Sequence, residues 1–130
     1  FGEYMGEFIK KGANVVFVIT NDGWWGDTPG YKQHIEFGRL LAVSLRRSVA
    51  QSANTGISGF IDQRGDIVQH TNWWERCALR QKINLNNALT WYAVHGDLLY
   101  RLSIYFSIAF VLLYLYAYVT GKTFVRRGEV

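Results

Sequence analysis

The chain has 130 residues, one cysteine, a formal net charge of +4 and an apolar content of 49%. This length suits one domain, and the single cysteine excludes an intrachain disulfide and a cysteine-rich metal motif. The charge does not indicate a nucleic-acid partner, because much of it lies in the C-terminal tail, which carries three basic residues and one acidic residue (Lys122, Arg126, Arg127 and Glu129).

The first predicted elements are a short helix and a buried strand. Residues 2–11 have the spacing of an amphipathic helix, and Gly12 is placed to end it. The run 15–20, VVFVIT, consists of β-branched and aromatic residues. Such a run predicts a central strand buried on both faces.

A polar turn and a second helix come next. Residues 21–27, NDGWWGD, combine turn-forming residues with two indoles directly after the predicted strand. Thr28 as N-cap and Pro29 at the first helical position predict a helix that runs to about Arg47. One face of this helix is apolar or small and is expected to face the core (Ile35, Gly38, Leu41, Ala42 and Leu45).

The middle of the chain is predicted to be rich in strands. Residues 49–53 form a short strand, and residues 56–60 and 67–69 flank a hairpin turn at 62–65. Residues 75–85 alternate between polar and apolar, which predicts a further, less buried strand.

Some side chains in this part have competing interpretations. Cys77 is expected to be an ordinary packed cysteine, because no turn or nearby acid would activate its thiol. Arg46 and Arg47 fit a solvated helix end, with binding of a lipid phosphate as the alternative. Trp73 and Trp74 fit either a membrane interface or the core.

The C-terminal part carries a membrane signal. Residues 102–119 contain no charged residue, and their number is about that needed to cross the hydrocarbon core of a bilayer. The predicted boundaries are 1–97 for a domain outside the cytoplasm, 98–120 for a transmembrane helix and 121–130 for a basic cytoplasmic tail. Aromatic residues within 86–97 fit the membrane interface.

Several stretches together resemble one family. Residues 20–27 (TNDGWWGD), 33–34 (QH) and 52–56 (SANTG) are similar to the nitrilase, or carbon–nitrogen hydrolase, superfamily. Within it they resemble most the bacterial apolipoprotein N-acyltransferases. Residues 2–3, residues 90–97 and the apolar segment that follows support this branch. The resemblance covers nearly the whole chain.

The resemblance implies an α/β fold, the C-terminal part of an α/β/β/α sandwich followed by one transmembrane helix. In this family a cysteine takes an acyl chain from a membrane phospholipid as a thioester and passes it to the N-terminal amine of a diacylglyceryl-cysteine lipoprotein. The implied location is the bacterial cytoplasmic (inner) membrane, with the catalytic domain on the periplasmic face. The resemblance implies no cofactor and no metal, and a monomer at full length.

The family's glutamate, lysine and nucleophilic cysteine match no residue of this chain, so no catalytic residue is assigned here. The chain begins on Phe1, inside a predicted helix. We therefore expect a fragment whose catalytic residues lie upstream and which is inert alone. A sandwich divided between its strands is also expected to expose an open edge and an apolar face.

The resemblance assigns the lining of the active site to a small set of residues (Asn21, Asp22, Trp24, Trp25, His34 and Asn54). Asn21 and Asp22 are expected to organise the loop, and the two indoles to line the acyl pocket, because sites of α/β proteins gather where buried strands end. The alternatives are an ordinary polar turn, a polar helical residue at His34 and a turn-shaping role for Asn54.

Two other functions stay open. A soluble amidase or nitrilase would hydrolyse small amides, but it has no use for an uncharged stretch long enough to span a membrane. A non-catalytic, membrane-anchored binding module would lack a cysteine upstream of Phe1.

Overall fold

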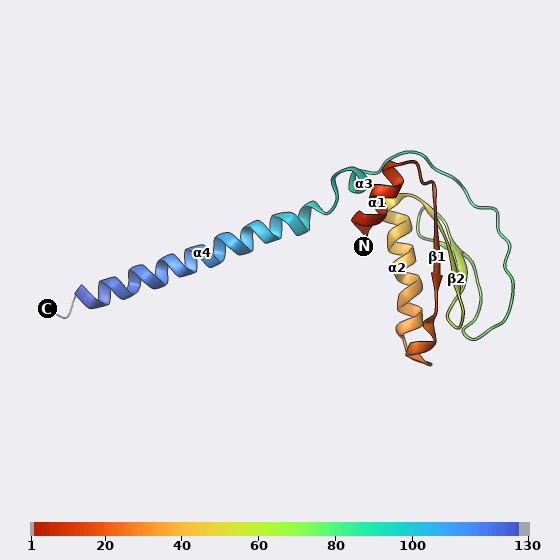
Figure 1. Ribbon diagram of the computed structural model, residues 1–130, viewed down its shortest axis with the longest axis horizontal. Coiled ribbons are helices and arrows are strands. Elements are labelled where there is room, and N and C mark those ends of the chain that lie inside the picture. Colours follow the sequence, from red (N-terminus) through yellow and green to blue (C-terminus); the bar gives the residue numbers. More distant parts are fainter. Residues whose placement is uncertain (1, 128–130) are drawn as a thin grey trace. The chain divides into compact units, whose positions relative to one another are not determined.

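The computed structural model describes residues 2–127, with side chains to Gly121, and has two compact units with a boundary between Gly96 and Asp97 (Figure 1). The first unit contains α1 (Gly2–Lys10), β1 (Val15–Thr20), the 3-10 helix η1 (Asp22–Trp25), α2 (Gly30–Leu45), β2 (Ser48–Ala53), β3 (Gly59–Ile61), β4 (Ile67–His70) and α3 (Trp91–His95). The second unit contains α4 (Leu98–Arg127). The predicted combination of a mixed α/β fold with a C-terminal apolar helix is confirmed.

The strands form one sheet in the order β1-β2-β3-β4. β1 and β2 are parallel, with Thr20 opposite Ala53 at their carboxyl ends, and α2 makes the crossover between them. β3 pairs antiparallel with both β2 and β4. The predicted hairpin is confirmed, although its first strand begins at Gly59 rather than at residue 56.

The core lies between the sheet and its helices. Figure 1 shows α1 and α2 on the same side of β1 and β2, and the predicted apolar face of α2 is buried throughout. Gly38 allows α2 to approach the sheet closely, because an added Cβ would lie 3.0 Å from the Cδ1 atom of Ile61. The buried cluster draws on α1, the sheet, α2 and α3 (Ile9, Val16, Ile35, Leu41, Ala42, Leu45, Val49, Ile61 and Ala93).

The environment predicted for β1 is wrong, although its bounds are confirmed. β1 is an edge strand of the described sheet, and Phe17 and Ile19 are 70% and 88% exposed. Alternate side chains of a strand point to opposite faces, and the helices cover only the face that carries Val16. The open edge and uncovered apolar face expected for a divided sandwich are therefore present.

The strand predicted for residues 75–85 is wrong, because this described segment is irregular. Its backbone pairs with no strand in the described chain and is held by side chains instead: the Ser48 hydroxyl and the Gln63 amide both donate to the carbonyl of Asn84. Cys77 is exposed, so its predicted packing is wrong as well. Residues 77–79 border the uncovered sheet face across a cavity of about 490 Å³.

The ends of α2 differ slightly from the prediction. The helix begins at Gly30, so Pro29 occupies the cap position and Thr28 precedes it, with its hydroxyl accepting from the Gly30 N–H at 3.4 Å. The helix ends at Leu45, because Arg46 adopts the left-handed conformation with φ 51°. Shifts of one or two residues are usual at helix ends.

In the second unit, α4 is long and apolar enough from Leu98 to Gly121 to cross a membrane. This range contains the uncharged stretch 102–119, and its large apolar side chains are exposed. The helix continues to Arg127, so the predicted tail begins within it, whereas residues 128–130 of that tail lie outside the described residues.

Candidate functional site

Two loops lie together at the carboxyl ends of β1 and β2. Because the strands are parallel, the turn after Thr20 and the loop after Ala53 leave the same edge of the sheet. The backbone N–H of Asn54 donates to the carbonyl of Thr20 at 3.0 Å. The stretches 20–27 and 52–56, which carry the family resemblance, are thus neighbours in space.

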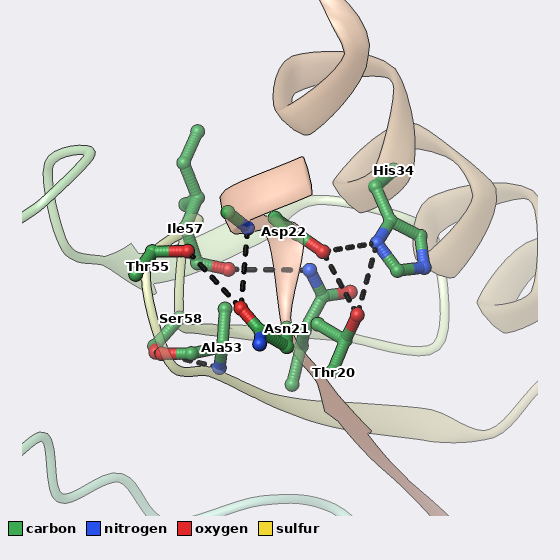
Figure 2. Close-up of polar contacts among 10 residues, drawn as sticks. Thr20, Asn21, Asp22, His34, Ala53, Thr55, Ile57 and Ser58 are labelled. Carbon is green, nitrogen blue, oxygen red and sulfur yellow. Dashed lines mark hydrogen bonds and ion pairs between the residues drawn. The ribbon is translucent and has the colours of Figure 1, made fainter. Parts of the chain in front are cut away.

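Asp22 is the centre of the first loop. Its side chain is fully buried, and its Oδ1 atom accepts from the hydroxyl of Thr20 and from Nδ1 of His34, each at 2.8 Å (Figure 2). A carboxylate can only accept hydrogen bonds, so this contact places a proton on Nδ1 of His34. The imidazole is 27% exposed. β1, η1 and α2 each contribute one member of this group.

The group is not a hydroxyl–histidine–carboxylate catalytic triad. In a triad the hydroxyl bonds to the ring nitrogen that does not face the carboxylate. Here the Thr20 hydroxyl donates to Asp22, and the ring atom near it, at 3.4 Å, is the same Nδ1 that faces the carboxylate. The arrangement holds three elements together but does not activate a nucleophile.

The second oxygen of Asp22 fits against a glycine. The Oδ2 atom is buried without a hydrogen-bond partner among the described residues, and a Cβ atom on Gly56 would overlap the Asp22 carboxylate. Gly56 therefore makes room for the carboxylate between the two loops.

Asn21 ties the loops together from the outside. Its Oδ1 atom accepts from the backbone N–H of Gly23 at 3.2 Å, which caps η1, and from the Thr55 hydroxyl at 3.4 Å. Figure 2 shows these bonds on the side of the turn away from His34.

The two indoles of η1 differ in their surroundings. Trp25 lies against the start of α2: its ring meets the His34 ring edge-on at 5.4 Å between centroids, and a Cβ on Gly30 would come within 2.8 Å of its Cγ atom. Trp24 is 85% exposed. Trp25 therefore packs against α2, whereas the side chain of Trp24 is exposed.

The structure brings most of the predicted site residues together. Asp22, His34 and Trp25 are linked by the contacts above, and Asn21 and Trp24 belong to the same turn. Asn54 is adjacent, but it is exposed and contributes a backbone N–H rather than a side-chain bond. The hydroxyls of Thr20 and Thr55 and the glycines at 30 and 56 also shape the site, although the sequence pattern predicted no role for them. Thr20, Thr55 and Gly56 lie within the stretches 20–27 and 52–56 that resemble the family, and Gly30 lies between 20–27 and 33–34. These positions are the sequence signal that could have indicated their role.

Trp73 and Trp74 have separate environments. Trp73 is partly buried and stacks on the buried ring of Tyr31 at 5.4 Å between centroids. Trp74 is 65% exposed, and its backbone N–H donates to the carbonyl of Thr55. A polar cavity of about 490 Å³ adjoins Trp74 and is bordered by Ser52, Asn54 and Arg76.

Arg47 is not the solvated helix end that the sequence predicted. It is 1% exposed, and its guanidinium donates to carbonyl oxygens, including those of Ala13 at 3.1 Å and Ala88 at 2.9 Å. Burial lowers the pKa of Arg47 from its ordinary value. With its donors turned inward, Arg47 is not placed to bind a lipid phosphate, whereas Arg46 is exposed.

Within the part of the chain that the structure describes, no three His, Cys, Asp or Glu side chains gather where they could hold a metal ion.

No protein-family model matches the chain. It is similar to proteins named apolipoprotein N-acyltransferase from Chlorobaculum tepidum (37% identity over 91 residues, 70% of this chain and 17% of that protein) and Haemophilus influenzae (33% over 107 residues, 82% and 20%). The protein of that name from Thermotoga maritima is 34% identical over 111 residues, 85% of this chain and 22% of its own length. The predicted resemblance is confirmed, and the chain spans about a fifth of the length of these relatives.

Proposed function

Because the chain is related to the apolipoprotein N-acyltransferases over most of its length, we propose that the full-length protein transfers an acyl chain from a membrane phospholipid to the N-terminal amine of diacylglyceryl-cysteine lipoproteins. This chain supplies the last part of the catalytic domain, residues 1–97, and a transmembrane helix at 98–120. The observation that carries the proposal is the joint presence of the indole-bearing turn at a sheet edge and an apolar helix of membrane-spanning length.

The chemistry divides a difficult acyl transfer into two easier steps. A thiolate attacks the ester carbonyl of the phospholipid, forms a thioester and releases the lysophospholipid. The lipoprotein amine then attacks the thioester, and the thiol leaves. We propose that the cysteine lies in another part of the full-length protein, together with the glutamate and lysine that assist it. The 130 residues alone are then inert.

The residues of this chain shape the site. Asn21 and Asp22 hold the turn, and Trp24 and Trp25 form part of the wall that an acyl chain contacts, since indoles combine a large apolar surface with a polar edge. His34 and Asn54 complete the lining. α4 keeps the domain at the periplasmic face of the inner membrane, with the basic tail in the cytoplasm. At the periplasmic face the enzyme, as a monomer, meets both of its lipid substrates.

The test uses the full-length protein, phospholipid vesicles and a diacylglyceryl-cysteine peptide, with and without an alanine at the upstream cysteine. We expect acyl transfer by the wild type and neither thioester nor product with the alanine variant. Transfer without that cysteine, or no transfer by a folded wild type, would contradict the proposal.

The indole wall is tested separately by Trp24→Ala in the same protein. We expect thioester formation to fall by about 10-fold, a loss typical of an aromatic contact residue. Trp91→Ala is the matched control, because Trp91 is also exposed but belongs to α3. Unchanged thioester formation in Trp24→Ala would remove the indole from the acyl site.

A further inference from the structure

We propose that Thr20, Asp22 and His34 form a latch that fixes the indole-bearing turn Asp22–Trp25, and that His34 is a positioning residue for acyl transfer. This inference rests on the proposed function for its kinetic consequence, but the latch itself is a structural statement that can be tested without activity.

The buried carboxylate of Asp22 joins the turn to its neighbours. Burying a carboxylate costs free energy, and hydrogen-bond donors to its oxygens offset that cost. The Oδ1 atom has two donors at 2.8 Å, from the strand before the turn and from the helix after it. Asp22 therefore joins the turn to both of its flanking elements.

The imidazole of His34 has two contacts. Its Nδ1 atom faces Asp22, while its ring packs against the edge of Trp25. Gly30 leaves space for the same indole. Loss of the imidazole would therefore remove the donor to the carboxylate and the ring contact to Trp25 together, and Trp24, the preceding residue of η1, would be held less firmly.

His34 acts by positioning the turn and not as a catalytic base. The Nδ1 proton is held by Asp22, and the Thr20 hydroxyl donates to the same carboxylate. A freed turn would spend only a fraction of its time in the competent arrangement, and the observed rate falls by that fraction. Displacing a substrate by as little as 1 Å can cost about 100-fold in rate.

The kinetic experiment compares His34→Asn with His34→Leu in the full-length protein. An asparagine amide can place a donor near the position of Nδ1, whereas leucine cannot. We expect thioester formation to fall by about 10-fold to 100-fold in His34→Leu and to fall less in His34→Asn, which keeps the donor but loses the ring contact with Trp25. Equal losses in both variants would overturn the donor role.

A double-mutant comparison separates positioning from an independent contribution. When Trp24→Ala and Trp25→Ala are already present, the latch has no indole left to position. His34→Leu should then cause little further loss, because effects within one coupled unit are not additive. A full, additive loss would show that His34 acts by itself or through general stability, and the proposal would be wrong.

A spectroscopic readout is independent of turnover. In full-length protein labelled with 5-fluorotryptophan, and assigned with Trp24→Phe, Trp25→Phe and Trp91→Phe, we expect His34→Leu to shift or broaden the signals of Trp24 and Trp25. The signal of Trp91 should stay in place, and the changes should be smaller in His34→Asn, which keeps a donor for Asp22 but not the ring contact with Trp25. Unchanged signals for both indoles in His34→Leu would overturn the latch even if the enzyme transfers acyl chains. A wild type without acyl transfer would overturn the proposed function but leave this test decisive.

Discussion

Gly56 shows how a residue without a side chain can set the geometry of a site. A methyl group at this position would overlap the carboxylate of Asp22, which is fully buried and cannot swing into solvent. We expect Gly56→Ala to lower the free energy of unfolding by about 1–3 kcal/mol, the range for overpacked sites, and to slow thioester formation. Thermal unfolding of the full-length protein in detergent measures the first effect.

The control for this substitution is Gly6→Ala in α1. An added Cβ there would lie 3.5 Å from the carbonyl oxygen of Ala93, an ordinary contact, and alanine suits a helix interior better than glycine. We expect no loss of stability. Equal unfolding temperatures for the two variants would mean that the Gly56 contact imposes no constraint.

Two neighbouring arginines at the end of α2 should respond in opposite directions. Arg47→Met would leave the carbonyls of Ala13 and Ala88 without their buried donor, so we expect a loss of about 3 kcal/mol in the free energy of unfolding. Arg46→Gly should keep stability or raise it by up to about 1 kcal/mol, because the left-handed conformation of Arg46 favours glycine. Denaturant titration of both variants checks this. A tolerated Arg47→Met would contradict the structural role of the guanidinium.

At the scale of single residues, the sequence predicted which residues belong to the site better than it predicted which residues they contact. The turn at 21–27, and the location of the site at the end of a strand, were predicted from the local sequence. The pairing of Asp22 with His34 did not, because it depends on how α2 lies over the carboxyl end of β1. The burial of Arg47 had no local signal either, since its acceptors at Ala13 and Ala88 are far away in sequence.

Among the elements, the β3–β4 hairpin carries a pH-dependent contact. Burial acts to raise the pKa of Asp62, but hydrogen bonds from the backbone N–H groups of Asp66 and Arg64 outweigh it, so this pKa is lowered. A carboxyl with a lower pKa in the folded state adds stability above its unfolded pKa of about 4, and this stability is lost as the pH falls through the folded pKa.

We therefore expect Asp62→Asn to cost about 1 kcal/mol or less at pH 7 and the difference from wild type to shrink in acid. Unfolding by denaturant at pH 7 and at a pH below the ordinary carboxyl pKa measures both values. A difference that stays constant with pH would show that the charge of Asp62 does not contribute.

Elements held by local patterns were predicted well, whereas those that depend on neighbours were not. The bounds of β1 and the apolar face of α2 follow from residue types and helical spacing. The segment 75–85 has the alternation of a strand but stays irregular, because a strand needs a hydrogen-bonded partner and the described chain provides none beside it. The same lack of a neighbouring layer exposes one face of β1.

α4 makes a prediction about insertion into a membrane. Arginine near the centre of a transmembrane helix costs about 3 kcal/mol, whereas arginine near its end can extend to the interface. We expect Val111→Arg to raise the fraction of full-length protein released by alkaline extraction, and Leu99→Arg to behave like the wild type. Equal extraction of both variants would mean that residues 98–121 do not lie across the bilayer.

At the scale of the whole molecule, the exposed face of the sheet is the most consequential surface. Phe17 and Ile19 project from an edge strand and are largely exposed. An apolar face beside unpaired strand edges favours aggregation. Covering one such side chain is worth about 1.5–3 kcal/mol. We expect the part of the full-length protein outside this chain to cover this face.

The double substitution Phe17→Thr and Ile19→Thr should therefore act oppositely in two contexts. In residues 1–96 expressed alone, it removes exposed apolar surface and places β-branched threonine at both strand positions, so the soluble fraction should rise. In the full-length protein it removes buried surface, so the unfolding temperature in detergent should fall by several degrees, because about 1 kcal/mol shifts it by a few degrees. Val68→Thr is a control on β4, where the exposed valine should matter less in both contexts. If the double variant left the full-length protein as stable as the wild type, the face would be open there too, and the site at its edge would be built without a second layer.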